Sequence, residues 1–227
     1  MSRFLHDSLT IAVKDLRSEL RTKEALNASV SFSLVILLLF SFAFDLPPEQ
    51  TREISGGLLW MVFAFAGALI LNRSFARELP NDCLDALIAS PVSGAALFIG
   101  KALANFVLLL VVEAVSLVVY GIFYNIAWWG QFWQLVGVLA LGTWAMTVIG
   151  TMFSALTVNL RLRELMLPTL VYPIMIPALM SAILLTTQLV SGQPLAGDVL
   201  VWLRLLVAFN VIFTALALSL VETVLVG

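Results

Sequence analysis

The residues that could do chemistry in this 227-residue chain are few and scattered. His6 is the only histidine and Cys83 the only cysteine, and no carboxylate cluster accompanies either at the spacing of metal ligands. The motifs of zinc proteases and serine hydrolases are missing, and no acidic pair at helical spacing falls inside an apolar run. We therefore expect no catalytic residue, no metal site and no cofactor bound directly by this chain.

One glycine-rich segment, Gly94 to Ala102, looks at first like a phosphate-binding loop. Five residues separate Gly94 from Gly100, where a phosphate loop has four, and Ala102 stands where that loop has the Ser or Thr that holds Mg²⁺. The segment also opens an apolar run instead of following a strand. We expect that this chain does not itself bind ATP.

Two charged residues fall inside apolar runs at similar depth, Glu113 and Arg204. An unpaired charge at such a depth is costly. The sequence predicts an intramembrane ion pair between Glu113 and Arg204, and a protonatable relay or a substrate contact at Glu113 is the alternative.

Three tryptophans, Trp128, Trp129 and Trp133, lie in the segment WWGQFW between two apolar runs. Tryptophan is enriched where a helix meets the membrane surface, so we expect an outer aromatic belt. The alternative is a platform for a flat ligand such as haem, for which a partner protein would have to supply the axial histidine.

The composition explains why so few reactive residues are present. Hydrophobic residues make up 61% and charged residues 11% of the chain, and the mean hydropathy is +1.05, beyond what soluble domains reach. The sequence predicts an all-α polytopic membrane protein that forms a single domain over 1–227, surrounded by lipid and without a nucleic-acid partner. Its six expected transmembrane helices cover residues 28–44, 56–71, 95–123, 132–158, 168–190 and 199–226.

The positive charges predict the orientation of these spans. Of the twelve Lys and Arg residues, only Arg52 and Arg204 fall on one side, and the other ten flank the N-terminus, the loop at 72–94 or the loop between the fourth and fifth spans. Positive charge concentrates on the cytoplasmic side. We therefore expect both termini and the 72–94 segment to be cytoplasmic.

The first 27 residues form a cytoplasmic segment with its own pattern. Leu9, Val13, Leu16 and Leu20 share one helical face over residues 8–24, among charged neighbours. This pattern is typical of a helix that lies in the headgroup plane, and a solvated charged tail is the alternative.

The 72–94 segment, NRSFARELPNDCLDALIASPVSG, contains a second short helix. Asn81 or Asp82 can cap it, Leu84, Leu87 and Ile88 line one face, and Pro91 ends it. So short a helix is marginal alone in water and needs a surface to dock on. We expect the docking residues to be Glu78, Asp82, Leu84, Asp85, Leu87, Ile88 and Pro91.

The fifth span contains three prolines, Pro168, Pro173 and Pro177. Each removes a backbone donor and is expected to kink the helix, either at a pathway or dimer interface or as an ordinary packing irregularity.

Six spans, a basic interfacial helix and a capped cytoplasmic helix ending in Ser-Pro together resemble the membrane subunits of type 2 ABC exporters. More narrowly, the chain resembles the haem exporter protein B family of cytochrome c maturation. The segments that carry this likeness are KDLRSELRTKE from Lys14, FARELPNDCLDALIASPVS from Phe75 and LVYPIMIPALM from Leu170. One departure is Asp82, where the family commonly has glycine.

The resemblance implies a bacterial inner-membrane permease subunit, present in two copies. Its implied partners are a cytoplasmic ABC ATPase, which holds the ATP, a haem-handling membrane subunit and a haem chaperone. ATP hydrolysis would release haem-loaded chaperone, or export haem, at the outer face. A type 2 permease for a lipid-linked glycan or drug, and a non-transporting membrane scaffold, are the alternatives.

Overall fold

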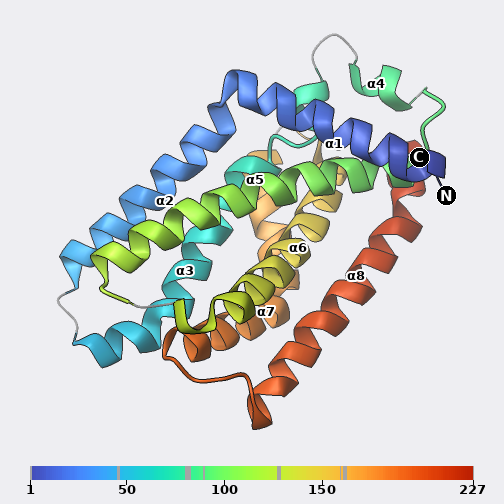
Figure 1. Cartoon of the computed structure of the whole chain (residues 1–227). Coiled ribbons are helices and arrows are strands. Elements are labelled where there is room, and N and C mark those ends of the chain that lie inside the picture. The colour runs from blue at the N-terminus through green and yellow to red at the C-terminus, as the bar shows by residue number, and fades with distance from the viewer. Residues whose placement is uncertain are drawn as a thin grey trace.

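The computed structural model describes residues 2–44, 47–79, 83–88, 90–126, 129–158, 160 and 163–226, and within them the regular structure is helical (Figure 1). The elements in chain order are α1 (Ser2–Thr22), α2 (Glu24–Ala43), α3 (Pro48–Leu71), η1 (Ala76–Glu78), α4 (Cys83–Ile88), α5 (Gly94–Phe123), η3 (Trp129–Gln131), α6 (Phe132–Thr157), α7 (Arg163–Val190), η4 (Gly197–Val199) and α8 (Leu200–Val226).

Six helices in the described part of the chain are long and apolar enough to cross a membrane, namely α2, α3, α5, α6, α7 and α8. The expected all-α class and the six spans are therefore confirmed. The largest shift in a boundary is at α3, which begins at Pro48 and not at residue 56. Proline has no N–H to lose in the first turn of a helix, so the polar stretch before residue 56 can extend the span.

Two helices form the centre of the bundle. The membrane-crossing parts of α3 and α6 are the most buried, whereas α2 and α8 lie at opposite edges (Figure 1). α2 packs on α3 and α5, and α8 packs on α6 and α7. The central pair is therefore covered on both sides.

Glycines allow the closest approaches between these helices. Gly56 of α3 lies directly against the backbone carbonyl of Ile183 and the hydroxyl of Thr187 on α7, so that a Cβ there would overlap both. Gly142 of α6 lies in the same way against the ring of Trp60. The neighbouring Gly57 has open space around it.

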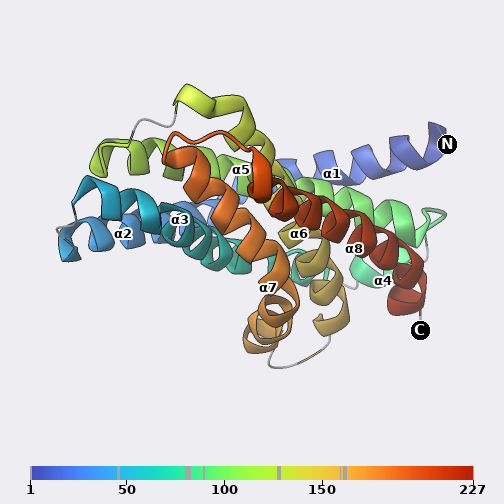
Figure 2. The ribbon, with the colours of Figure 1, turned by 90° about the horizontal axis from the view of Figure 1, so that it is seen from below.

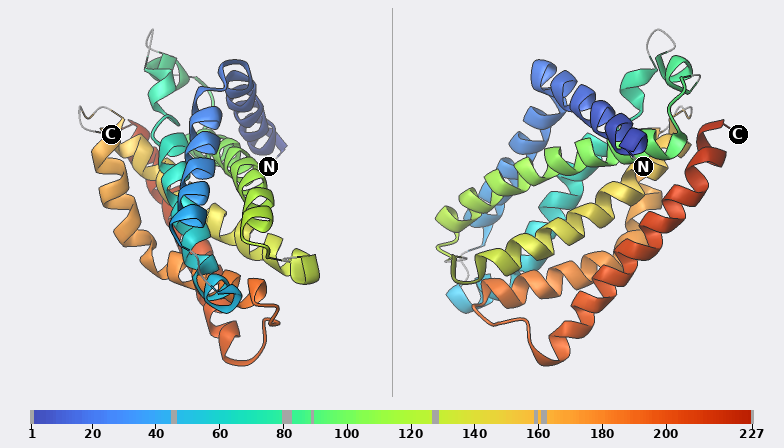
Figure 3. Two further views of the ribbon diagram at one scale, coloured as in Figure 1. Left: turned by 90° about the vertical axis from the view of Figure 1, so that its left-hand side faces the viewer. Right: turned by 45° about the vertical axis from the view of Figure 1, so that its right-hand side comes forward.

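The three prolines of the fifth span, Pro168, Pro173 and Pro177, all lie inside α7. Figure 3 shows α7 as an unbroken helix that bends along its length, and a contact near the prolines attaches it to α3. The hydroxyl of Tyr172 donates to the carbonyl of Ala64 on α3 at 2.8 Å. Within α7 itself, the hydroxyl of Ser181 donates to the carbonyl of Pro177 at 2.8 Å.

Both chain termini lie at the end of the bundle that carries α4 (Figures 1 and 2). α1 runs across this same end and packs along the beginning of α5 (Figure 1). We call this end of the molecule the α4 end.

Candidate functional site

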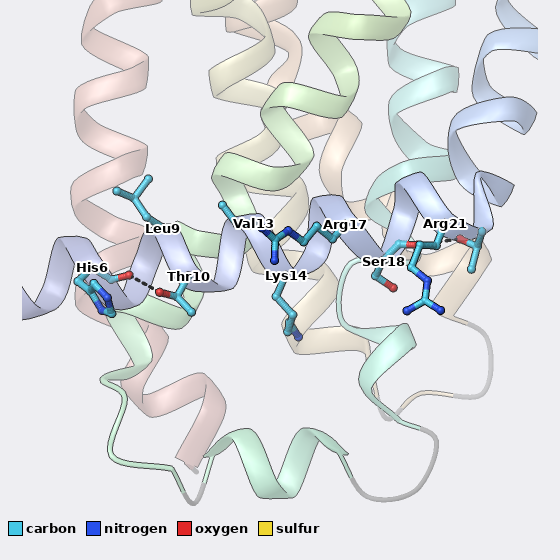
Figure 4. A pocket seen from close by; sticks show the side chains of 9 residues that line it. His6, Leu9, Thr10, Val13, Lys14, Arg17, Ser18 and Arg21 are labelled. Carbon is cyan, nitrogen blue, oxygen red and sulfur yellow. Dashed lines mark hydrogen bonds between the residues drawn. The ribbon is translucent and has the colours of Figure 1, made fainter.

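The short helix α4 stands apart from the ends of the long helices (Figures 1 and 4). Its helical character over Cys83–Ile88 confirms the helix expected there. Cys83 and Ala86 are exposed and Leu87 is half-buried. Asp82 lies outside the described residues, as do the side chains of Leu84, Asp85 and Ile88.

The residues that flank α4 are anchored on the bundle. Leu79 before it and Val92 after it pack against a small apolar cluster that contains Phe75, Leu97 and Ile11. Pro91 is exposed. The segments before and after α4 are therefore both fixed to the bundle.

α1 contributes to this cluster because it lies very close to α5. A Cβ added at Gly100 would lie 2.7 Å from the Cβ of Ile11 and 2.7 Å from the carbonyl oxygen of Ser8. The second glycine of the segment that looks like a phosphate loop thus has a packing role.

A charged cluster joins α1 to the segment before α4, and we define it as Lys14, Asp15, Glu19, Arg77, Glu78 and Lys101. Its centre is Lys101, which is only 1% exposed. The Lys101 Nζ donates to Asp15 Oδ2 at 3.1 Å, to Glu78 Oε1 at 3.0 Å and to the carbonyl of Ser74 at 3.0 Å. A buried ammonium is tolerated only with such partners.

The shifted pKa values of Glu78 and Lys14 widen the pH range over which these two side chains are charged. Burial alone would raise the pKa of Glu78, but the charges and hydrogen bonds of Lys101 and Lys14 lower it below its ordinary value of 4.5. Burial alone would lower the pKa of Lys14, but Glu78 and Asp15 raise it above its ordinary value of 10.5. The stabilisation from Glu78 is lost only as the pH falls through its lowered pKa, and that from Lys14 only as the pH rises through its raised pKa.

Glu19 is the second centre of the charged cluster and is fully buried. Its Oε2 accepts from the Arg77 guanidinium, and its Oε1 accepts from the backbone N–H of Leu26 at 2.8 Å. Leu26 is in the first turn of α2, whose N–H groups have no partner within the helix. Glu19 therefore connects α1, the start of α2 and the segment before α4.

A further pair, Glu24 with Arg73 at 2.7 Å, joins the start of α2 to the residues just after α3. This pair is largely exposed, with side-chain exposures of 68% and 47%. Residues 73–78 are thus held against α1 and α2 at several points.

Most of this charged cluster was not predicted from the sequence. Glu78 was expected to face a docking partner, but its carboxylate is held by Lys14 and Lys101, with 13% of the side chain exposed. Asp15, Glu19 and Lys101 were not singled out. Lys101 was the residue in the sequence that could have indicated the cluster, because a lysine inside a long apolar run needs a buried counter-charge.

The polar contacts continue from the cluster along α5. Asn105 donates through its Nδ2 to Ser74 Oγ at 2.9 Å and to Thr151 Oγ1 of α6 at 3.0 Å. Deeper in the bundle, Glu113 is 2% exposed and accepts a hydrogen bond from Thr143 of α6.

The expected ion pair between Glu113 and Arg204 is not formed. Arg204 is exposed on α8, and the Glu113 Oε2 has no partner among the described residues. The two residues have a similar depth, but Glu113 faces α6 and Arg204 lies on the surface of the outermost helix.

The outer tryptophans lie at the end of the bundle opposite α4. Trp129 and Trp133 are 69% and 81% exposed, and Phe132 lies between them in ring contact with both. Trp128 lies outside the described residues. This exposure fits a membrane-surface belt.

His6 lies on α1 at the α4 end, and its Nδ1 is 3.5 Å from Asp7 Oδ1. Among the residues that the structure describes, no three His, Cys, Asp or Glu side chains are placed to hold a metal ion.

Residues 6–222 match the CcmB protein family. The chain is 30% identical to heme exporter protein B of Rhodobacter capsulatus over 157 residues, which cover 69% of this chain and 72% of that protein. The heme exporter protein B of Paracoccus denitrificans is 29% identical over 161 residues, covering 71% and 73%. That of Pseudomonas aeruginosa is 27% identical over 203 residues, which cover 88% of each chain.

Proposed function

This chain belongs to the CcmB protein family, and we infer from this membership that it is the membrane permease subunit of the ABC transporter of cytochrome c maturation. The observation that carries the inference is the match over residues 6–222, which includes α2, α3, α5, α6 and α7 in full and α8 as far as residue 222. As a multi-pass protein of this family it resides in the bacterial inner membrane, as one transmembrane domain.

The element proposed to meet the ATPase subunit is α4. It is too short to be stable alone in water, yet it is presented away from the bundle by two anchored flanks. A helix in this position needs an external surface to cover its apolar residues. The nucleotide site is then on the partner, and this subunit has none of its own.

The charged cluster is proposed to carry the motion of α4 into the membrane. Glu78 and Arg77 lie just before α4 and are ion-paired to α1 and α5 through buried groups. A pull on the 73–78 segment would therefore displace α1 and the start of α5 together.

We further propose that the complex handles haem without ligation by side chains of this subunit. Two copies would work with two ATPase subunits and with a haem-handling membrane subunit and chaperone, and ATP hydrolysis would release the loaded chaperone at the outer face. His6, the one histidine, lies on α1 at the α4 end, whereas the outer tryptophans lie at the opposite end of the bundle.

Leu87→Asp is expected to abolish co-purification of the ATPase subunit with this chain. The change removes roughly the 1.5 to 3 kcal/mol of a buried apolar side chain and adds the cost of burying a charge. The matched control is Gly130→Asp, which places the same charge at an open position at the other end of the bundle. Unchanged recovery of the ATPase with Leu87→Asp would show that α4 is not the docking element.

The α4 end is proposed to be cytoplasmic. In a Cys83→Ser background, single cysteines at the exposed positions Glu49, Gly130 and Gln193 are expected to react with an impermeant thiol reagent added outside. A cysteine at Arg21, or the native Cys83, should be protected until the membrane is permeabilised. The reverse labelling pattern would show that the α4 end lies on the outer side of the membrane.

Identification of the co-purified proteins also separates the alternatives. A haem protein together with an ATPase supports the maturation role. An ATPase without any haem protein would favour a permease for a glycan or drug, and neither protein would favour a scaffold.

A further inference from the structure

α1 divides its charged residues between two faces. Asp15 and Glu19 are turned inward, where they pair with Lys101 and Arg77. Arg17 and Arg21 are on the other side of the helix, where the described part of the chain gives neither of them an ion pair or a hydrogen bond. Arg17 and Arg21 therefore present positive charge on the outer face of α1, whereas Lys14 beside them is paired with Asp15 and Glu78.

Apolar residues adjoin these arginines on the surface of α1. Leu9 is 57% exposed, Val13 is 43% exposed and Leu20 is 57% exposed, at spacings that place them along one stripe. The buried face of the helix is a different one, formed by Ser8, Ile11 and their neighbours. The packing of α1 on α5 therefore leaves this apolar stripe exposed.

The stripe and the arginines border one shallow, open groove of about 910 Å³ along the outer face of α1. Its lining residues all belong to this helix, among them Leu9, Val13, Lys14, Arg17 and Arg21. Figure 4 shows its polarity: Leu9 and Val13 point toward the level of the long helices, whereas Lys14 and Arg21 point toward α4. The groove is thus apolar on the membrane side and basic on the side of the headgroups.

We propose that this groove binds an anionic phospholipid. Its phosphate lies between Arg17 and Arg21, which are one helical turn apart, and its acyl chains run over Leu9 and Val13. Guanidinium groups bind phosphate through paired N–H donors, and an apolar stripe beside a basic face is what a bilayer surface accommodates. Asp15 and Glu19 would repel the phosphate, and their inward pairing removes that repulsion.

An acidic protein surface matches the groove less well. A partner that docks on α4 approaches from the side where Lys14 and Arg21 point, and it would leave Leu9 and Val13 uncovered. A lipid satisfies both sides of the groove at once, and its binding can be measured on the chain without any ATPase.

The test measures lipid retention by the purified full-length chain, using native mass spectrometry in mixtures of phosphatidylglycerol and phosphatidylcholine. The parent chain is expected to retain phosphatidylglycerol preferentially. Arg17→Gln with Arg21→Gln should lower this preference roughly 30-fold, which corresponds to about 1 kcal/mol for each basic side chain at a membrane surface. Equal retention of the two lipids by the parent chain would overturn the proposal.

The matched control is Arg52→Gln with Arg204→Gln, which removes the same charge from exposed positions outside the groove. This control should keep the preference, as should Arg17→Lys with Arg21→Lys in weaker form. An equal loss in the control and in the groove variant would mean that net charge alone attracts the lipid, and would refute the site. If the groove variant keeps its lipid preference but no longer co-purifies the ATPase, the groove belongs to a protein partner and the proposal fails.

Discussion

Replacement of Glu19 by alanine is expected to lower the free energy of unfolding by about 3 to 5 kcal/mol, the usual cost of breaking a buried ion pair from one side. The change leaves the Arg77 guanidinium, 29% exposed, without its carboxylate. It also removes the acceptor for the N–H of Leu26 at the start of α2. Denaturant unfolding followed by circular dichroism in a fixed detergent measures the loss.

The chain offers a matched control in Glu24, which pairs with Arg73 nearby. Because this pair is mostly exposed, Glu24→Ala should cost less than about 1 kcal/mol. Combining Glu19→Ala with Arg77→Ala should cost less than the sum of the two single changes, since no charge is then stranded. Equal effects of Glu19→Ala and Glu24→Ala would mean that burial of the Glu19 pair does not matter.

The second large effect is expected from Gly56→Val in α3. The added Cβ would overlap the carbonyl of Ile183, which is a backbone atom and cannot rotate away. Overpacking usually costs about 1 to 3 kcal/mol, and the upper end is expected here because whole helices must separate. We expect a strong decrease in folded, monodisperse protein by size-exclusion chromatography and a lower melting temperature.

Gly57→Val is the control, because a Cβ at this next position along the same helix would have nothing within 4 Å of it. It introduces the same side chain with the same helix propensity, so it isolates the contact with α7. If the two variants behave alike, the loss comes from the propensity of valine and not from helix contact.

The sequence was sufficient for the number of spans because hydrophobic length is a property of each segment alone. A run of apolar residues long enough to cross a bilayer predicts a helix without knowledge of its neighbours. For this reason α5 and α6 begin and end within one residue of their predicted limits. The polar start of α3 was not predicted, because the length of an apolar run gives no information about polar helical turns at its end.

Side-chain partners were harder to predict, because they depend on how each helix is rotated about its axis. Glu113 and Arg204 were matched by depth, which gives a position along the membrane normal but no direction. Glu78 was assigned outward from its place beside α4, but the position of Lys101 on a distant part of the chain turns it inward. These side-chain partners could be predicted only with knowledge of how the helices pack, including α1 on α5.

The joint between α1 and α2 has a mechanical consequence. A single residue, Lys23, separates the two helices, and its φ of 54° is in the left-handed region that costs a lysine about 1 to 2 kcal/mol. The buried carboxylate of Glu19 on α1 spans this junction, because it accepts a hydrogen bond from the N–H of Leu26 on α2. Because one residue separates the two helices and a buried carboxylate bridges them, we expect α1 and α2 to move as one bent unit. α1 crosses the α4 end and α2, of nearly the same length, runs along the edge of the bundle. The buried residues of α2 include Ala25, Ser29 and Ser33, and the hydroxyl of Ser29 donates to the carbonyl of Ala66 on α3 at 3.1 Å. A displacement of α1 would therefore reach α3, one of the two central helices, through α2.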